Sequence, residues 1–282
     1  MRAKKTKSFA HGLLMLLSVI LVLSCSACLP QENQVAPVTQ LPFGIEEPAG
    51  AGSASSYTVP YDWSCLSQKN GRFSYSKGWV PASLTGIDVS EHQGWIDWEA
   101  VATDGIDFAI IRLGNRGYSA GDLYLDDYFY SNVEGARNAG IKVGVYFFSQ
   151  SISRLEALHE AKLVIRALEG IPLDYPVFFD HEPVDDTMGR ANSISSRQLT
   201  QNAQAFCEYI ENNGYVAMLY GNKKTIEKID AKVRDRYGVW FAEYGVLIPS
   251  ASFDFAIWQY SSSGVVAGIE TRVDMNIHFL YP

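Results

Sequence analysis

Eight short apolar segments alternate with stretches of helical spacing between residues 84 and 282, and this alternation limits the possible folds of the chain more than any other feature. The apolar segments are rich in β-branched and aromatic residues, which is typical of strands. Strands that alternate with helices are parallel to one another. The predicted strands are Leu84–Ser90, Phe108–Gly114, Lys142–Ser149, Pro176–Glu182, Val216–Asn222, Gly238–Tyr244, Phe253–Ser261 and Val273–Phe279, and the predicted helices are 96–104, 126–139, 153–169, 195–213 and 222–236.

Eight strand–helix units predict an α/β fold, a (β/α)8 TIM-like barrel. The connections 245–252 and 262–272 are too short for full crossover helices, so we expect an irregular barrel with short or missing helices in the last units. An open doubly wound sheet is the alternative. That fold commonly carries a glycine-rich phosphate loop after the first strand, and none follows residue 90.

The first 28 residues are typical of a signal peptide, with four basic residues, an apolar run from Leu13 to Leu23 and then small residues. The run is shorter than the ~20 residues that span a bilayer. Val22-Leu23-Ser24-Cys25 resembles a bacterial lipobox. We therefore expect export and lipidation at Cys25, which would place the protein at the outer face of the cytoplasmic membrane or in the cell wall. Cleavage near Ala27, giving a secreted protein, and a retained anchor helix are the alternatives.

The net charge of the chain limits the kinds of partner that it can bind. Four of the 23 basic residues and none of the 31 acidic ones precede Cys25, so the rest of the chain has a net charge of −12. Nucleic-acid binding needs clustered Lys and Arg, so we expect no such partner, and membrane contact only through the lipid anchor.

Cys65 and Cys207 can pair in an oxidising compartment. Cys207, however, lies on an apolar helix stripe, which favours a buried free thiol.

Two segments separate the leader from the predicted barrel, residues 84–282. Residues 29–56 are rich in Pro, Gly, Ala and Ser, and we expect a flexible linker. Residues 57–83 contain six aromatic side chains and an Asn70-Gly71 turn signal. This aromatic-rich N-terminal segment is too short to enclose its own core, so we expect it to strap onto the barrel. A separate cell-wall-binding module is the alternative.

Asp180 and Glu182 stand one residue apart at the end of the fourth predicted strand. Residues i and i+2 of a strand point to the same face, so both carboxylates project together. Two close carboxylates cannot both ionise freely, and one pKa rises. Glycoside hydrolysis uses such a proton donor beside a second carboxylate. Taken alone, an Asp-x-Glu pair is more often a solvated loop start or an ion-pair partner.

The other predicted strand ends carry a consistent set of polar and aromatic residues. In barrels of this kind, function lies at the face formed by the C-terminal strand ends. Aromatic rings stack on sugars, and carboxylates and amides bond to hydroxyl groups, so the face suits a carbohydrate cleft. The side chains are Asp88, Ser90, His92, Gln93, Arg112, Tyr146, Phe148, Gln150, Tyr220, Asn222, Trp240, Glu243, Tyr244, Trp258, Gln259, Tyr260, Asp274 and Asn276.

Five motifs then follow one another in a fixed order. They are Gly86-Ile87-Asp88-Val89-Ser90-Glu91-His92-Gln93-Gly94 with Ile96-Asp97-Trp98; Asp126, Phe129, Asn132, Ala136 and Ala139-Gly140; Gly144-Val145-Tyr146-Phe147-Phe148; Asp180-His181-Glu182; and Trp258-Gln259-Tyr260 with Val273-Asp274-Met275-Asn276. This order resembles glycoside hydrolase family 25, the Chalaropsis-type lysozymes or N-acetylmuramidases. The resemblance covers residues 84–282 nearly end to end.

The resemblance implies a retaining enzyme that cleaves the β-1,4 bond between N-acetylmuramic acid and N-acetylglucosamine in peptidoglycan glycan strands, without cofactor or metal. Glu182 would be the general acid, and Asp180 would stabilise the oxocarbenium-like centre or orient the substrate's N-acetyl group. Asp88 and Asp274 would line the cleft and tune these charges. The nucleophile, Asp180 or the substrate acetamide, stays open. The substrate-binding residues would be Tyr146, Tyr220, Trp240, Trp258, Gln93 and Arg112.

His181 departs from the family pattern, which has an apolar or aromatic residue between the paired acids. Strand alternation points its ring away from the cleft, as a packed histidine; a pH-dependent influence on Glu182 is the alternative. Asp185 and Asp186 follow in a loop, where solvated charges are favoured over a metal site.

We expect a monomer. Two rival functions are a non-catalytic glycan-binding lipoprotein on the same barrel and a chitinase-type hydrolase. The chitinase reading is disfavoured because residues 173–182 lack the middle acids of its strand-four motif.

Overall fold

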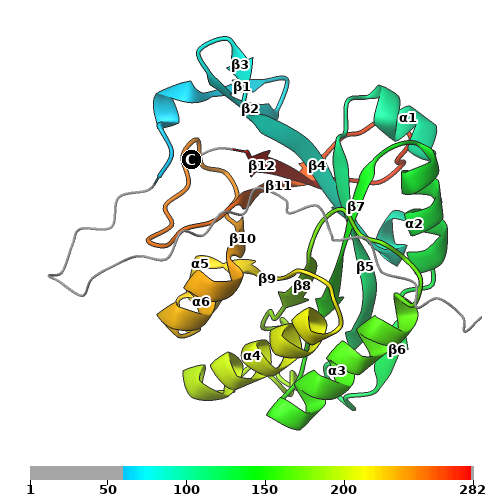
Figure 1. Ribbon diagram of the computed structural model, residues 1–282, viewed down its shortest axis with the longest axis vertical. Coiled ribbons are helices and arrows are strands. Elements are labelled where there is room, and N and C mark those ends of the chain that lie inside the picture. The colour runs from blue at the N-terminus through cyan, green and yellow to red at the C-terminus, as the bar shows by residue number, and fades with distance from the viewer. Residues whose placement is uncertain (1–59, 281–282) are drawn as a thin grey trace, which may run out of the picture. The chain divides into compact units, whose positions relative to one another are not determined.

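The computed structural model of the chain describes residues 60–280, and its eight main strands close into a barrel (Figure 1). The first strand, β4, pairs with both the second, β5, and the last, β12, which completes the ring. The predicted α/β barrel is therefore confirmed. The predicted signal peptide, Cys25 and the linker 29–56 lie outside the described residues. The barrel strands are β4 (Ser83–Val89), β5 (Phe108–Arg116), β7 (Lys142–Phe148), β8 (Val177–Asp180), β9 (Ala217–Asn222), β10 (Val239–Ala242), β11 (Ile257–Gly264) and β12 (Val273–Phe279).

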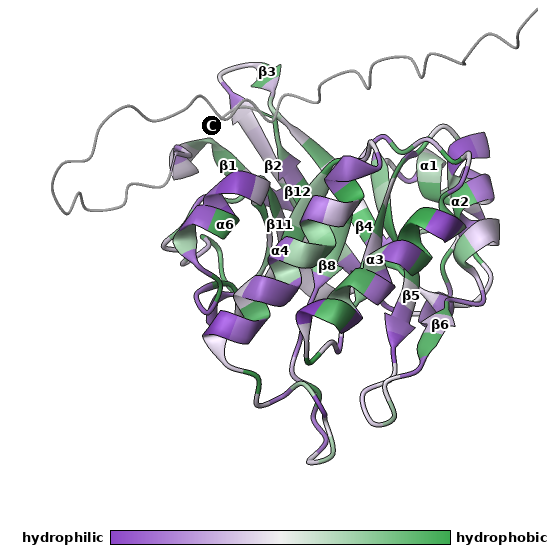
Figure 2. Cartoon of the chain, turned by 60° about the horizontal axis from the view of Figure 1, so that its bottom comes forward, coloured by the Kyte–Doolittle hydropathy of each residue, from purple (hydrophilic) through white to green (hydrophobic). Residues whose placement is uncertain are grey.

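Helices cover the outer face of the strands that are parallel and regularly connected. Ser153 and Ser195 cap the two longest helices by accepting hydrogen bonds from backbone N–H groups of the first turn. Both helices carry alternating hydrophobic and hydrophilic stripes (Figure 2). The helices are α1 (Trp98–Thr103), α2 (Phe129–Asn138), α3 (Arg154–Ala167), α4 (Ser196–Asn212), α5 (Lys223–Ile226) and α6 (Ala231–Tyr237), with one-turn 3-10 helices η1 (Trp63–Cys65) and η2 (Glu91–Gln93).

One local prediction needs correction, and one element was not predicted. The helix expected over 222–236 is broken into α5 and α6, because the Asp230 side chain accepts a hydrogen bond from the Lys232 N–H and starts a second helix. An additional short strand, β6 (Leu123–Leu125), pairs with the end of β5 outside the barrel.

The expected parallel arrangement fails for β12, which runs antiparallel to both β11 and β4. A parallel return needs a crossover of a dozen or more residues, and only residues 265–272 separate β11 from β12. The reversal has a consequence for the site. Asp274 stands at the start of β12, yet it pairs with Asp88 at the end of β4, so both carboxylates reach the same face of the barrel.

Two apolar layers hold the barrel together. The inner layer fills the barrel lumen with side chains such as Phe108, Phe178 and Trp240, and a larger layer packs between the strands and the elements outside them. Gly86 belongs to the inner layer, because a Cβ there would lie 2.3 Å from the Phe108 ring. The ring occupies the space that the glycine leaves.

The N-terminal segment, residues 60–82 (the strap), covers the outside of β11 and β12, where helices are missing (Figure 1). It forms a three-stranded antiparallel sheet of β1 (Leu66–Lys69), β2 (Arg72–Lys77) and β3 (Val80–Pro81). Asn70 and Gly71 both have positive φ, so the hairpin turn lies where the sequence predicted it.

Aromatic side chains of the strap join the barrel's outer apolar layer. The Phe73 ring lies 4.8 Å from that of Trp258, and the Tyr61 ring lies 4.4 Å from that of Phe279. The Tyr61 hydroxyl donates to the Phe255 carbonyl at 2.5 Å. The strap therefore shares one core with the barrel.

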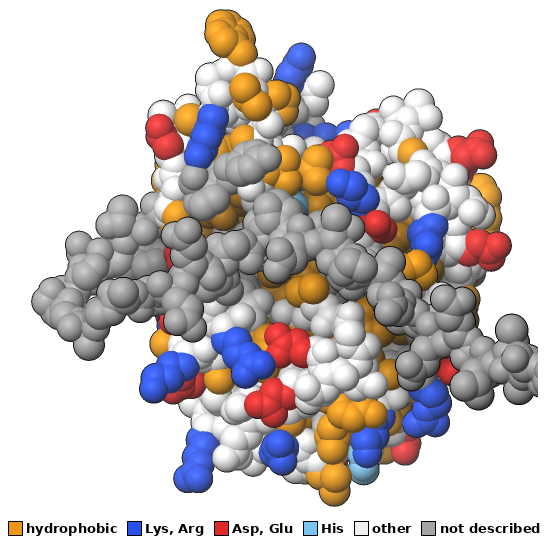
Figure 3. All heavy atoms as spheres, viewed as in Figure 1, with side chains coloured by type: hydrophobic (Ala, Val, Ile, Leu, Met, Phe, Trp, Pro, Cys, Tyr) orange, Lys and Arg blue, Asp and Glu red, His pale blue; other side chains and the backbone are white. Residues whose placement is uncertain are grey.

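Charged side chains of both signs are interspersed over the visible face of the molecule (Figure 3). Within residues 60–280, no helix has the length and apolar character needed to cross a membrane.

Candidate active site

A cavity of about 220 Å³ opens at the C-terminal ends of the barrel strands, and all four predicted acids line it. Asp88 comes from β4, Asp180 and Glu182 from the end of β8, and Asp274 from β12. The full lining is Asp88, Arg112, Tyr146, Phe148, Asp180, Glu182, Tyr220, Trp240, Tyr244, Gln259, Ser262 and Asp274. Residues that are almost 190 positions apart in the chain thus meet in one small polar space.

Asp88 is held by two side-chain amides. Gln259 Nε2 donates to Asp88 Oδ2 at 2.7 Å, and Asn276 Nδ2 donates to the same oxygen at 2.8 Å. Burial and the charge of Asp274 raise the pKa of Asp88, and the two amides oppose that rise. Burial also raises the pKa of Asp274, while a hydrogen bond with Asp88 opposes it. This pair retains protons more readily than free carboxyl groups do.

Asp180 and Glu182 form the second pair. Burial, followed by the charge of Glu182, raises the pKa of Asp180, and Arg112 acts in the opposite direction. Burial and the charge of Asp274 raise the pKa of Glu182. Asp180 Oδ1 is buried and has no hydrogen-bond partner within the described part of the chain. A buried carboxylate oxygen without a partner is costly, which marks it as a group reserved for a ligand.

The backbone around Glu182 is fixed from the neighbouring strand. Gln150 follows β7, and its Nε2 donates to the Glu182 carbonyl oxygen at 2.7 Å. Arg112 is anchored on the other side, because its Nε donates to Asp126 Oδ2 at 2.7 Å and its Nη2 lies 2.8 Å from Glu91. The cation is therefore tied to other carboxylates and lies within range of Asp180.

Aromatic side chains form the walls of the cavity. The rings of Tyr220 and Trp240 lie 4.3 Å apart, and Tyr146 meets Trp240 edge-on at 6.2 Å. Trp240 Nε1 donates to Asn276 Oδ1 at 2.8 Å, so the indole is fixed by the same amide that holds Asp88. Tyr146, Tyr220 and Trp240 lie where the sequence predicted them.

Two predicted substrate-binding residues do not line the cavity. Trp258 faces the outer layer, where its ring packs on Phe73 and its Nε1 donates to the Glu243 carbonyl. Alternation along β11 turns Gln259 inward and Trp258 outward. Gln93 instead closes a capping box, because its Oε1 accepts from the Ser90 N–H, and its Nε2 donates to the Arg272 carbonyl at 3.3 Å.

Four cavity-lining residues without a predicted role complete the site: Phe148, Tyr244, Gln259 and Ser262. The hydroxyls of Tyr220 and Tyr244 both donate to Gln259 Oε1, at 2.8 and 2.5 Å, and Gln259 in turn donates to Asp88. The sequence analysis placed Tyr244 and Gln259 on the face formed by the strand ends but assigned them no role. Ser262 lies beyond a bulge in β11, where simple alternation no longer applies.

His181 points away from the cavity, as strand alternation predicted. Its Nδ1 lies 3.2 Å from the Ser149 carbonyl, and burial lowers its pKa to about 4. Within residues 60–280, no group of three or more His, Cys, Asp and Glu side chains is placed to hold a metal ion.

Comparison with known proteins gives the same family that the motifs indicated. Residues 87–269 match the glycosyl hydrolases family 25. The chain belongs to this family. It is 29% identical over 194 residues to an autolytic lysozyme from Clostridium acetobutylicum, covering 68% of this chain and 55% of that protein. The chain thus spans about half the length of that relative.

Solved structures of other proteins share the fold. A family 25 glycosyl hydrolase from Bacillus anthracis superposes with a TM-score of 0.58 at 20% identity, covering 75% of this chain and 94% of that one. The modular autolysin LytC from Streptococcus pneumoniae, solved in complex with a synthetic peptidoglycan ligand, gives 0.62 at 22% identity, covering 75% and 51%. The family 25 match begins at residue 87, so the strap precedes it.

Proposed function

We propose that this family 25 chain is a muramidase that hydrolyses the β-1,4 bond between N-acetylmuramic acid and N-acetylglucosamine in peptidoglycan, with retention. The observation that carries the proposal is the convergence of two buried carboxyl groups, Asp88 and Asp180, and two partly buried ones, Glu182 and Asp274, on one cavity walled by aromatic rings. All four have raised pKa values. A carboxylic acid that keeps its proton near neutral pH beside a second carboxyl group is what glycoside hydrolysis requires.

Glu182 acts as the general acid. Burial, followed by the negative charge of Asp274, raises the pKa of Glu182 and favours its protonated form. It gives this proton to the glycosidic oxygen as the bond to the anomeric carbon breaks, so the leaving sugar departs as a neutral alcohol. The resulting carboxylate then takes a proton from the water that attacks the anomeric carbon, which returns Glu182 to its starting state.

Asp180 faces the reacting centre from the same strand end. Its unpaired Oδ1 supports two roles: it forms a bond to the anomeric carbon itself, or it accepts the N–H of the substrate's N-acetyl group while the acetamide oxygen forms that bond. In each route, two successive displacements at the anomeric carbon retain its configuration. The amide-held Asp88 and the rings of Tyr146 and Trp240 would hold the sugar.

The protein would act at the outer surface of the cell that makes it. The leader and Cys25 support export and lipid attachment. The linker, residues 29–56, would reach on the order of 30 Å as a flexible coil, which limits action to nearby wall. Mass spectrometry of the mature N-terminus tests this assignment. An unmodified N-terminus on protein released into the medium would contradict it.

The function is tested by digesting purified peptidoglycan with the full chain and identifying the new reducing ends. We expect muramic acid ends, and Glu182→Gln should lower the rate by about 10²–10⁴-fold. Glu99→Gln on α1 is the matched control and should keep wild-type activity.

Two other outcomes would contradict the muramidase assignment. Glucosamine ends would favour the chitinase-type reaction. Absence of cleavage by wild type with retained glycan binding would favour a non-catalytic glycan-binding lipoprotein.

A further inference from the structure

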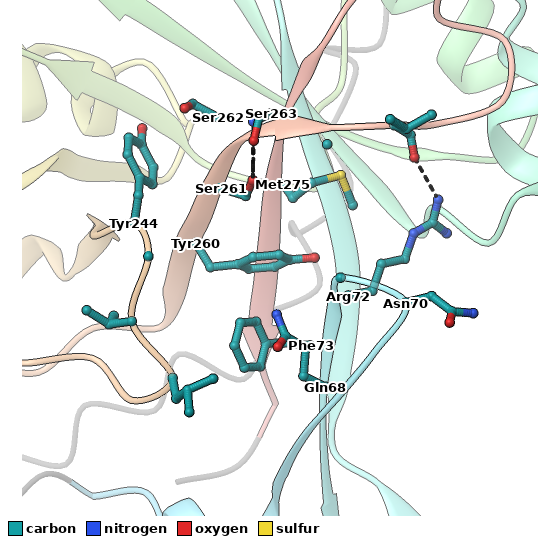
Figure 4. A pocket seen from close by; sticks show the side chains of 16 residues that line it. Gln68, Asn70, Arg72, Phe73, Tyr244, Tyr260, Ser261, Ser262, Ser263 and Met275 are labelled. Carbon is teal, nitrogen blue, oxygen red and sulfur yellow. Dashed lines mark hydrogen bonds between the residues drawn. The ribbon is translucent and has the colours of Figure 1, made fainter.

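A second, larger hollow of about 620 Å³ lies beside the catalytic cavity (Figure 4). The β1–β2 hairpin of the strap forms one wall, the loop 244–247 forms the other, and the end of β11 forms the floor. Tyr244 and Ser262 line both spaces, so the hollow adjoins the catalytic cavity. Its volume is within the ~300–1,000 Å³ range of ligand sites.

One face of the β1–β2 hairpin is turned toward the hollow. Gln68 pairs with Phe73 across the hairpin, so both side chains lie on the face toward the barrel. Ser67 pairs with Ser74, and these two lie on the opposite face. Arg72 pins the hairpin to the rest of the molecule, because its guanidinium bonds to the Asp104 carboxylate and to the Asp104 carbonyl.

The lining favours an uncharged, hydroxyl-rich ligand. It offers amides, three consecutive serines at 261–263 and aromatic rings beside apolar side chains such as Leu247 and Met275, and it contains no acidic residue. Its single arginine, Arg72, is already paired with Asp104, so no free cation is left to meet the carboxylates of a peptide. Figure 4 shows Tyr244 on one side of the hollow and Asn70 on the other, with the Tyr260 ring between them. Tyr244 is 46% exposed, which leaves ring surface for stacking on a sugar.

We propose that this hollow, here named the strap groove, is a saccharide subsite that holds the glycan strand beyond the units at the catalytic cavity. The inference rests on the proposed function, since the occupant is the same polymer. It deepens that function, because the hairpin precedes the family 25 match and would add a preference for long strands to the activity of the barrel.

The test is a tryptophan scan of the two faces of the hairpin in the full chain. Gln68→Trp fills the strap groove, whereas Ser74→Trp places the same side chain on the opposite, exposed face. The probes are long peptide-free glycan strands, with the lactyl carboxylates of their muramic acid units converted to amides so that the strand is uncharged, and the fluorogenic aryl glycoside of the N-acetylglucosaminyl-N-acetylmuramic acid disaccharide. We expect Gln68→Trp to lower kcat/KM on long strands about tenfold and to leave the aryl glycoside unchanged. Ser74→Trp should match wild type on both probes.

Three results would overturn the proposal. They are an unchanged rate of Gln68→Trp on long strands, an equal loss on both probes, and a loss that appears only with peptide-bearing peptidoglycan, which would assign the groove to the stem peptide. If wild type cleaves neither probe, the proposed function fails on its own. Calorimetric titration with peptide-free strands then still tests the groove, and weaker binding by Gln68→Trp than by Ser74→Trp would support it, whereas equal binding would overturn it.

Discussion

The two sides of the barrel bury their outer faces with different elements. On one side, α4 covers β8, and the Phe206 ring lies 5.3 Å from that of Phe179. On the other side, the strap covers β11, and the Phe73 ring lies 4.8 Å from that of Trp258. All four rings are almost completely buried. A barrel strand therefore needs an apolar cover, and a short β-sheet supplies it as well as a helix does.

Matched truncations on the two sides would show whether the covers are equivalent. We expect Phe73→Ala and Phe206→Ala each to lower the free energy of unfolding by about 3–5 kcal/mol, because each leaves a cavity in a packed layer. Denaturant unfolding measures both. Trp79→Ala is the control, since Trp79 is 100% exposed on the strap, and its effect should stay within ~0.5 kcal/mol. A loss of stability for Phe73→Ala as small as that of the control would mean that packing of the strap on the barrel contributes little to the free energy of unfolding.

The sequence predicted one cover better than the other, for a physical reason. α4 lies between the strands it covers, so local periodicity reveals both. The strap covers β11 and β12 from the far end of the chain, and no local pattern shows which face it meets. Six aromatic residues in a short segment did indicate that it needed a partner. The direction of β12 was missed although its cause was visible in the sequence: the connection 262–272 is too short for a parallel return, and connection length, not the strand's own residues, sets the direction.

The site shows the same limit at the level of single residues. Asp88, Asp180, Glu182 and Asp274 were found because they stand in predicted strands whose motifs, in order, resemble family 25. Trp258 was misplaced because alternation identifies two faces of a strand without saying which one is inside. Gln93 was recoverable, since Ser90 and Gln93 have the spacing of a capping box.

Buried titratable groups on the two sides should respond to pH in opposite directions. Glu160 on α3 accepts from Arg116 and Ser149, yet burial raises its pKa from 4.5 to about 7. The folded state then binds more protons than the unfolded state, so stability should fall as pH rises from 4.5 to 7. His278 on β12 bonds to the Tyr175 hydroxyl, and burial lowers its pKa from 6.5 to about 4. Its contribution should be lost as pH falls from 6.5 to 4.

The measurement is the free energy of unfolding from pH 4 to 7 for wild type, Glu160→Gln and His278→Gln. The difference in the free energy of unfolding between each variant and wild type should change by up to ~3 kcal/mol across the pH window of the substituted group. The change with pH should have opposite signs for the two variants. His181 also has a lowered pKa and makes the stability of wild type depend on pH in the same direction as His278. Because its contribution is common to wild type and both variants, only the differences from wild type are compared. Slopes of the same sign would contradict the opposite pKa shifts of Glu160 and His278.

The two sides also cooperate in the site, since Glu182 comes from β8 and Asp274 from β12. Asp274 raises the pKa of Glu182, so Asp274→Asn should lower that pKa and move the alkaline limb of the kcat/KM profile to lower pH. The loss at neutral pH should stay below the ~100-fold minimum expected for losing the proton donor itself. Asp185→Asn removes a charge from the exposed loop after Glu182 and should leave the limb in place. If the alkaline limb of Asp274→Asn does not move, the charge of Asp274 does not raise the pKa of Glu182.

The smallest effect should come from the cysteines, one on each side. Cys65 ends η1 in the strap and Cys207 is buried in α4, and both thiols are free. The strap is therefore held by packing and hydrogen bonds. We expect reductant to leave Tm unchanged, with Cys65→Ser behaving in the same way. A disulfide would contribute about 2–4 kcal/mol, so a clear fall of Tm in reductant would show that a covalent link joins the two sides and that packing alone does not keep the strap in place.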